Sequence, residues 1–167
     1  MFSKKRLWLL LGALGLNVIC HMLTVFVHIP TTALKVGGSY AAVLATWVAV
    51  AVLPLPTQLA VQVFVVFAAS VGSCMNMYTH CACYDLLIHY LSGVVLGCAG
   101  WQLEKKWLFA LIFSWAGAGL WEIFEFSCDV LLHAGMQGAA IDTMTDMIAG
   151  FLGGLTWLAG GKFIIKH

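Results

Sequence analysis

Charged side chains are scarce in this sequence. They make up 9% of the 167 residues, whereas apolar residues make up 62% and the mean hydropathy is +0.98. A soluble domain carries roughly 25% charged residues, and a small globule cannot hide this much apolar surface from water. The scarcity therefore excludes a soluble protein, and the net charge of +1 gives no reason to expect a nucleic-acid partner.

Proline is rare too, and no long linker or low-complexity tract interrupts the apolar segments. Six segments are long enough to cross a bilayer, which takes about 20 helical residues. They cover residues 7–29, 38–53, 57–77, 85–103, 107–132 and 142–165. Pro54 and Pro56 separate the second from the third, because proline removes a backbone donor and disfavours helix in the residue before it. We predict an all-α polytopic membrane protein, a bundle of about six transmembrane helices in a single domain over residues 1–167.

The basic residues give this bundle an orientation. If the N-terminus is cytoplasmic, Lys35 alone falls outside, and all the others fall on the cytoplasmic side: Lys4, Lys5, Arg6, Lys105, Lys106, Lys162 and Lys166. Such a bias follows the positive-inside rule and predicts that both termini are cytoplasmic. The first apolar segment is longer than a signal-peptide core and lacks a clear cleavage site, so we expect a retained signal anchor.

Acidic residues are few but concentrated. Six of the seven fall in the last three predicted spans, in the halves that this orientation places outside: Asp85, Glu122, Glu125, Asp129, Asp142 and Asp146. An ionised carboxylate is costly in a bilayer and usually faces a bundle interior or a water-filled cavity. No Lys or Arg lies near them in sequence. Spans one to three, by contrast, are predicted to be a mostly apolar scaffold.

The spacing of these residues is helical. Asp85 and His89 are four residues apart, and so are Asp142 and Asp146, while Glu122 is followed by acids three and seven positions later. Each set therefore lies on one helix face. Glycines follow in the first and last of these helices and allow close helix approach. We expect the three polar faces to meet roughly 5–10 Å below the outer surface.

Carboxylates brought together repel one another, so protons or a cation must neutralise them. Oxygen ligands with one histidine suit a divalent cation such as Mg, Mn, Ca or Zn. The candidate metal ligands are Asp85, His89, Glu122, Glu125, Asp142 and Asp146. A site that holds protons is the alternative. Asp85 and Asp142 also fit helix N-caps, and Asp129 fits a loop residue.

Four segments of the C-terminal half carry a family resemblance. They are Tyr84-Asp85-x-x-x-His89-x-x-x-Gly93, Trp121-Glu122-x-x-Glu125-Phe126, Gly135-x-Gln137-Gly138 and Asp142-Thr143-x-x-Asp146-Met147. In this order they resemble YjdF-type bacterial inner-membrane proteins and, more distantly, VanZ-like proteins. The resemblance implies a multi-pass protein of the bacterial cytoplasmic (inner) membrane, without an established reaction. The VanZ-like link to glycopeptide resistance points by analogy to envelope lipids or cell-wall precursors.

Two classes of function follow, and we favour the first. An enzyme would act on a lipid or lipid-linked headgroup, with the cation polarising a phosphate or activating water and with Glu122 or Glu125 and His89 as catalytic base and acid. The other class is a proton- or cation-coupled transporter, or a non-catalytic accessory subunit. No Walker loop, G-x-S-x-G or H-E-x-x-H motif is visible. Membrane lipids are the expected partners, and the sequence leaves open whether the chain forms a homo-oligomer.

The remaining polar residues receive structural interpretations. Asn17 and His21 are expected to hydrogen-bond between helices. Gln58 and Gln62, at the cytoplasmic end of the third span, are expected to cap a helix or to snorkel. Cysteines near the outer face, including Cys81 and Cys83, are expected to be free thiols or to form one disulfide. A soft-metal site at His80-Cys81-x-Cys83 is the less favoured alternative, because the spacing is not a standard zinc pattern.

Overall fold

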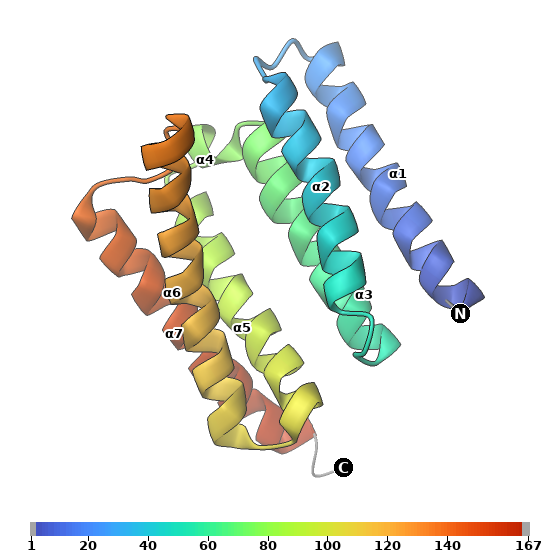
Figure 1. Cartoon of the computed structure of the whole chain (residues 1–167), viewed down its shortest axis with the longest axis vertical. Helices are drawn as coiled ribbons and strands as arrows, with labels where there is room; N and C mark the ends of the chain where they lie inside the picture. The colour runs from blue at the N-terminus through green and yellow to red at the C-terminus, as the bar shows by residue number, and fades with distance from the viewer. Residues whose placement is uncertain (1–2, 165–167) are drawn as a thin grey trace. The chain divides into compact units, whose positions relative to one another are not determined.

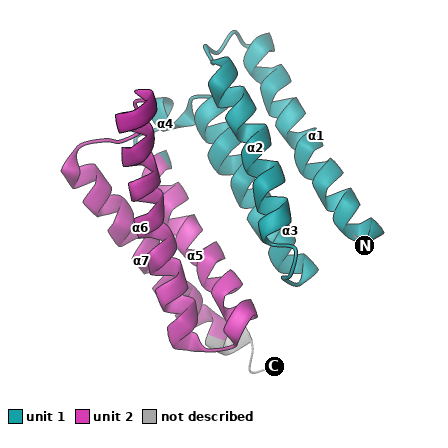
Figure 2. Ribbon diagram, in the orientation of Figure 1, with its two compact units in different colours: residues 1–84 teal, residues 85–167 magenta. Residues whose placement is uncertain are grey.

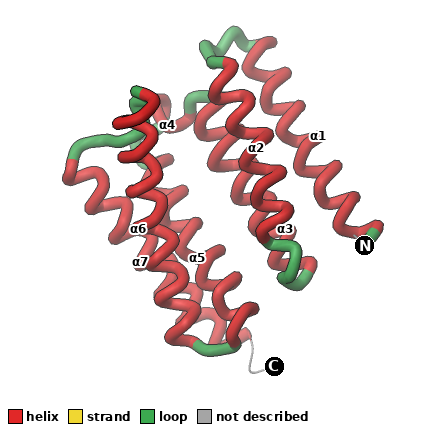
Figure 3. Tube along the Cα trace, in the orientation of Figure 1, coloured by secondary structure: helices red, strands yellow, loops and turns green. Residues whose placement is uncertain are grey.

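The structure is a computed structural model that describes residues 3–164. Every regular element in that range is helical (Figure 3), so the all-α prediction is confirmed. The elements, all but η1 labelled in Figure 1, are α1 (Lys4–Phe26), α2 (Ala33–Ala49), α3 (Leu55–Val65), the π-helix η1 (Val66–Cys74), α4 (Met77–His80), α5 (Tyr84–Glu104), α6 (Trp107–Leu132) and α7 (Ala140–Ile164). Residue 165, the predicted end of the last span, and Lys166 lie outside the described residues.

Helix starts follow local sequence signals. The Thr32 hydroxyl caps α2 by accepting a hydrogen bond from the backbone N–H of Lys35 at 3.2 Å. Pro54 and Pro56 stand at the start of α3, where their missing N–H groups would have no helical partner anyway. Beyond Val65 the helix continues in π geometry to Cys74. Such a long π segment is unusual, and nothing in the sequence predicted it.

Within residues 3–164, four helical rods are long and apolar enough to cross a membrane. They are Lys4–Phe26, Leu55–Cys74, Tyr84–Glu104 and Trp107–Leu132, and Ala33–Ala49 is a shorter apolar helix. Large apolar side chains are exposed along them, for example Phe26, Leu34 and Leu131 at 81%, 69% and 75%. A surface this apolar suits lipid rather than water. The chain is therefore a membrane protein with several apolar helices, while the number six stays a prediction.

The helices form two compact units, coloured separately in Figure 2. Unit 1 is Met1–Tyr84, with α1 to α4, and unit 2 is Asp85–His167, with α5 to α7. Each unit is described by itself below. The division into two units does not test the prediction of a single transmembrane domain.

Unit 1 has a polar core. Asn17 accepts hydrogen bonds from the hydroxyls of Ser39, at 3.0 Å, and Ser70, at 2.7 Å, which joins α1 to α2 and η1. This confirms the interhelical role predicted for Asn17. Gln62 is also buried and donates to Thr46 at 3.0 Å, so the prediction that it caps a helix or snorkels is wrong. The expected apolar scaffold instead has apolar outer faces around polar interhelical contacts.

Unit 2 is held by close helix contacts at small residues. A methyl group at Gly93 on α5 would collide with the carbonyl oxygen of Gly150 on α7, and one at Gly153 would collide with the carbonyl oxygen of Tyr90. Ser114 on α6 donates to the carbonyl of Gly93 at 2.9 Å. The three helices therefore meet as the glycine spacing predicted.

Candidate functional site

A histidine surrounded by carboxylates lies in unit 2. His89, on the second turn of α5, is 5% exposed. Its Nε2 atom lies 3.5 Å from Oδ1 of Asp85 and 3.9 Å from Oδ2 of Asp146, and its Nδ1 atom lies 3.8 Å from Oε1 of Glu122. We call these four residues the carboxylate–histidine cluster. They come from three different helices.

Helical geometry explains how they meet. Asp85 stands one turn before His89 on α5, so both point the same way. Asp146 stands six residues into α7, about 9 Å along the helix. The close approach of α5 and α7 at Gly93 and Gly150 lies roughly one turn beyond these residues. That approach allows a carboxylate on α7 to reach an imidazole on α5.

The two nitrogen atoms of the His89 ring have different neighbours. Asp85 and Asp146 lie on the Nε2 side, and each of these three residues offers one ligand atom within 4.8 Å of the others. Glu122 lies on the Nδ1 side, and its carboxylate also interacts with Thr143. The Glu122 side chain is 7% exposed, and its Oε1 atom is buried without a hydrogen-bond partner in residues 3–164. A buried acceptor of this kind is costly unless a donor reaches it.

Charge is not balanced in this cluster. Three carboxylates surround one imidazole, and His89 is the one basic side chain in ion-pair range of them among the described residues. Lys106, which pairs with Glu104, is at the opposite end of α6. The carboxylates therefore need protons or a bound cation.

Two of the predicted site residues, Glu125 and Asp142, lie outside the cluster, and so does Asp129, which was not predicted as a ligand. Glu125 is half-buried and accepts a hydrogen bond from Trp121 Nε1 at 2.8 Å, although it is near enough to Glu122 and His89 to feel their charge. Asp142 is exposed, in the first turn of α7. Asp129 accepts hydrogen bonds from the backbone N–H groups of Met136 and Gln137, at 2.7 and 3.0 Å. Asp129 thus holds the loop between α6 and α7.

The N-cap alternative does not describe Asp85 and Asp142. Both are in the first turn of their helices, after the helix has begun at Tyr84 and Ala140. An acid in the first turn still interacts favourably with the helix dipole. Asp85 is therefore stabilised by its helix and is a cluster member as well.

The helices are tightly packed beyond the cluster. Ser114 is the one other buried polar side chain among the described residues of unit 2. At the far end of the unit, Trp101 and Trp107 stack with ring centroids 4.2 Å apart. Unit 2 thus has no continuous file of buried polar side chains along residues 85–161.

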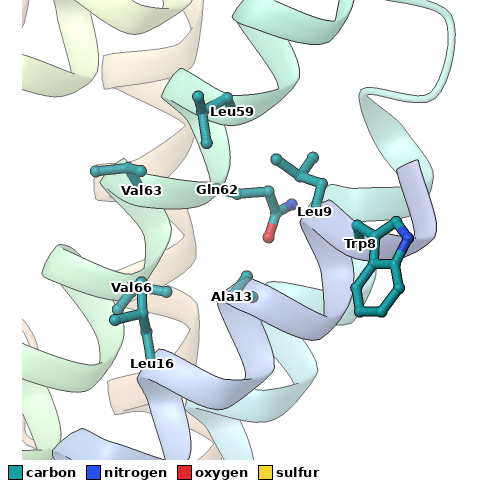
Figure 4. Close-up of a pocket in the computed structure, with 9 residues that line it drawn as sticks. Trp8, Leu9, Ala13, Leu16, Leu59, Gln62, Val63 and Val66 are labelled. Atoms are coloured by element: carbon teal, nitrogen blue, oxygen red, sulfur yellow. The ribbon is translucent and has the colours of Figure 1, made fainter. Parts of the chain in front are cut away.

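A separate cavity of about 300 Å³ lies in unit 1 between α1 and the α3–η1 rod (Figure 4). Its wall is apolar except for Gln62, and no titratable residue lines it: Trp8, Leu9, Gly12, Ala13, Leu16, Leu59, Gln62, Val63 and Val66. Sequence reasoning missed this cavity, which has no group for acid–base or metal chemistry.

Comparison with known proteins agrees with the membrane assignment. The profile of a family described as "Predicted membrane protein (DUF2238)" matches residues 7–167. No curated protein and no solved structure matches the chain. The finer resemblance to YjdF-type and VanZ-like proteins stays a prediction.

Proposed function

Because the chain belongs to the DUF2238 family of predicted membrane proteins, we propose that it crosses the bacterial cytoplasmic membrane six times, with both termini in the cytoplasm. The distribution of basic residues supports this orientation, with Lys35 alone on the outer side. In this arrangement the carboxylate–histidine cluster opens toward the outer surface. Its depth, about 9 Å from the start of α7, is that of lipid headgroups and the first acyl carbons.

The cluster binds one divalent cation in this proposal. Asp85, Asp146 and the Nε2 atom of His89 are the ligands, and Glu122 accepts a hydrogen bond from the Nδ1–H group. The observation that carries it is the buried, unpartnered Oε1 atom of Glu122, 3.8 Å from that ring nitrogen. Metal-bound histidines almost always donate their second ring N–H to a carboxylate, a backbone carbonyl or water. One imidazole with two carboxylates favours Zn²⁺ or Mn²⁺ over Mg²⁺ and Ca²⁺.

The bound cation acts on a lipid or lipid-linked headgroup in this account. It would polarise a phosphate oxygen or lower the pKa of a bound water. Glu125 lies near the cluster without belonging to the ligand set, and its carboxylate is the candidate general base. The apolar cavity of unit 1 has the size and lining to take part of an acyl chain, so lipids are the expected partners there as well.

The direct test is a lipid-conversion assay. Proteoliposomes of the full chain in a bacterial polar lipid extract are incubated with Zn²⁺ or Mn²⁺, and headgroup release or transfer is followed by mass spectrometry. We expect Asp146→Asn to reduce conversion roughly 100-fold or more, because it weakens a ligand. The matched control Asp142→Asn removes a nearby acid outside the ligand set and should retain activity.

A wild-type protein that binds metal but converts no lipid would overturn the enzymatic part of the proposal. The transporter or accessory-subunit alternatives would then replace it. Transport is less favoured because α5, α6 and α7 are closely packed beyond the cluster, with Ser114 as the next buried polar side chain. A transport route through unit 2 would need more polar groups there.

A further inference from the structure

Soft metal ligands are concentrated in the segment that joins η1 to α5. Ten consecutive residues hold six sulfur or imidazole side chains: Cys74, Met75, Met77, His80, Cys81 and Cys83. No carboxylate occurs in this segment, since the first acidic residue of the chain is Asp85. Thiolate, thioether and imidazole donors without carboxylates suit soft cations and disfavour hard ones.

Two of these donors already lie side by side. The Sγ atoms of Cys81 and Cys83 are 3.5 Å apart, and both cysteines are free. Cys83 is exposed and Cys81 is half-buried, so an ion can reach them. Two thiolates that share a metal at about 2.3 Å each lie roughly 3.5–4.6 Å apart, from a bent to a linear arrangement. Small rotations of exposed side chains are then enough to bind an ion.

The hydrogen bonding of His80 leaves one ring nitrogen available for a metal. Its Nδ1 atom lies 2.8 Å from the backbone carbonyl oxygen of Asn76. A carbonyl only accepts hydrogen bonds, so Nδ1 carries the proton and Nε2 keeps a lone pair for coordination. A hydrogen bond from the second ring nitrogen to a carbonyl is the usual support of a metal-bound histidine.

The segment is held in place by Asn76. This residue adopts a left-handed conformation, with φ of 55°, which turns the chain after η1. Its side chain donates to the carbonyl of Pro30 at 2.6 Å and accepts from the Lys35 ammonium at 2.8 Å. The turn that presents His80, Cys81 and Cys83 is therefore tied to the start of α2 and the loop before it. Such order before binding lowers the entropic cost of binding an ion.

We propose that Cys81 and Cys83, with His80 as a third donor, form a binding site for a soft monovalent ion of the Cu(I) type. Cu(I) is stable with two or three sulfur and imidazole ligands, whereas structural Zn²⁺ needs four. Binding replaces the two thiol protons by the metal, so each bound ion releases two protons and no electron is transferred. This proposal is independent of the carboxylate–histidine cluster.

Acidity should weaken binding at this site. Both thiols must lose their protons to bind the ion, so protons compete with the ion for the two sulfur atoms as the pH falls. The apparent affinity for Cu(I) should therefore increase with pH across the neutral range.

The test is a competition for Cu(I) under anaerobic, reducing conditions. The full chain in detergent competes with bathocuproine disulfonate, whose Cu(I) complex is followed by its absorbance. We expect the wild type to withdraw one Cu(I) per chain, and Cys81→Ser/Cys83→Ser to lose affinity roughly 100-fold or more. The control variant Cys20→Ser/Cys128→Ser removes two other cysteines and should behave as wild type, as should Glu122→Gln.

Three results would overturn the proposal. They are a wild type that fails to compete, a Cys81/Cys83 variant that competes as well as the control variant, and a wild type that binds Zn²⁺ but not Cu(I). Because Cys83 is exposed and Cys81 half-buried, the paired serine substitutions should leave thermal unfolding in detergent unchanged. His80→Ala keeps both thiols and should cost a smaller factor, roughly 10-fold.

Discussion

The carboxylate of Glu122 lies beside the Nδ1 atom of His89, away from the Nε2 atom that Asp85 and Asp146 approach. Oε1 of Glu122 is buried, has no hydrogen-bond partner in residues 3–164, and lies 3.8 Å from Nδ1 of His89. At this distance the two atoms are not hydrogen-bonded, but a small approach would let Nδ1 donate to Oε1. That hydrogen bond would leave the lone pair of Nε2 on the side of Asp85 and Asp146, as a metal needs.

Removing the acceptor behind the imidazole should weaken metal binding. We expect Glu122→Leu to lower the affinity for Zn²⁺ or Mn²⁺ about 10–100-fold, the usual effect of losing such a supporting carboxylate. Glu122→Gln keeps an acceptor oxygen and should cost less. Isothermal titration calorimetry in detergent measures both. Glu125→Gln is the control, and an equal loss in that variant would contradict the role assigned to Glu122.

The approach of α5 and α7 should be sensitive to a single methyl group. Gly93→Ala places a methyl against the carbonyl oxygen of Gly150, so the helices must separate. We expect a destabilisation of about 1–3 kcal/mol and weaker metal binding, because Asp146 moves away from His89. Gly119→Ala is the control, since its methyl meets only Met147 Cε at 3.9 Å. Thermal unfolding in detergent separates the two, and equal midpoints would argue against this packing.

The polar core of unit 1 should contribute measurably to its stability. Asn17→Leu keeps a similar volume but deprives the buried Ser70 hydroxyl of its acceptor. We expect a cost of about 1–2 kcal/mol, near the upper end for hydrogen bonds between membrane helices. Ile19→Ala, on the exposed side of the same helix, should cost less. A larger loss for Ile19→Ala would show that Ile19 faces a protein contact rather than lipid.

The proposed orientation can be tested with the native cysteines. Cys83 is exposed, whereas Cys74 is buried. We expect a membrane-impermeant maleimide added to intact cells to label the wild type, and Cys81→Ser/Cys83→Ser to lose that label. Labelling of Cys83 only after the cytoplasmic face is opened would reverse the orientation.

The sequence predicted which acids lie together better than it predicted what each of them contacts. Asp85 and His89 share a helix face whatever surrounds them, and Asp146 and Glu122 lie too far inside their helices to be caps. Glu122 and Asp129 also share a face, so periodicity alone treats them alike. They differ in their distance from the end of α6, because Asp129 reaches the backbone of the α6–α7 loop and Glu122 does not. That distance depends on the residue at which α6 ends.

The sequence predicted that Asn17 hydrogen-bonds between helices, but it did not predict the partners of Asn17 in the polar core of unit 1. Asn17, Ser39 and Ser70 are single polar residues on three different segments, and nothing in their spacing pairs them. They meet only when α1, α2 and η1 pack. The π geometry of η1 has no sequence signature either, although the apolar run predicted a helix there.

The most direct test of the account is the metal content of the protein. The full chain is purified in detergent without chelators, equilibrated with Zn²⁺ or Mn²⁺, desalted and analysed by elemental mass spectrometry, beside His89→Ala/Asp146→Asn. The account predicts one divalent ion per wild-type chain and none in the double variant, with Asp142→Asn unchanged. A folded wild type without metal, or equal metal in the wild type and the double variant, would contradict it.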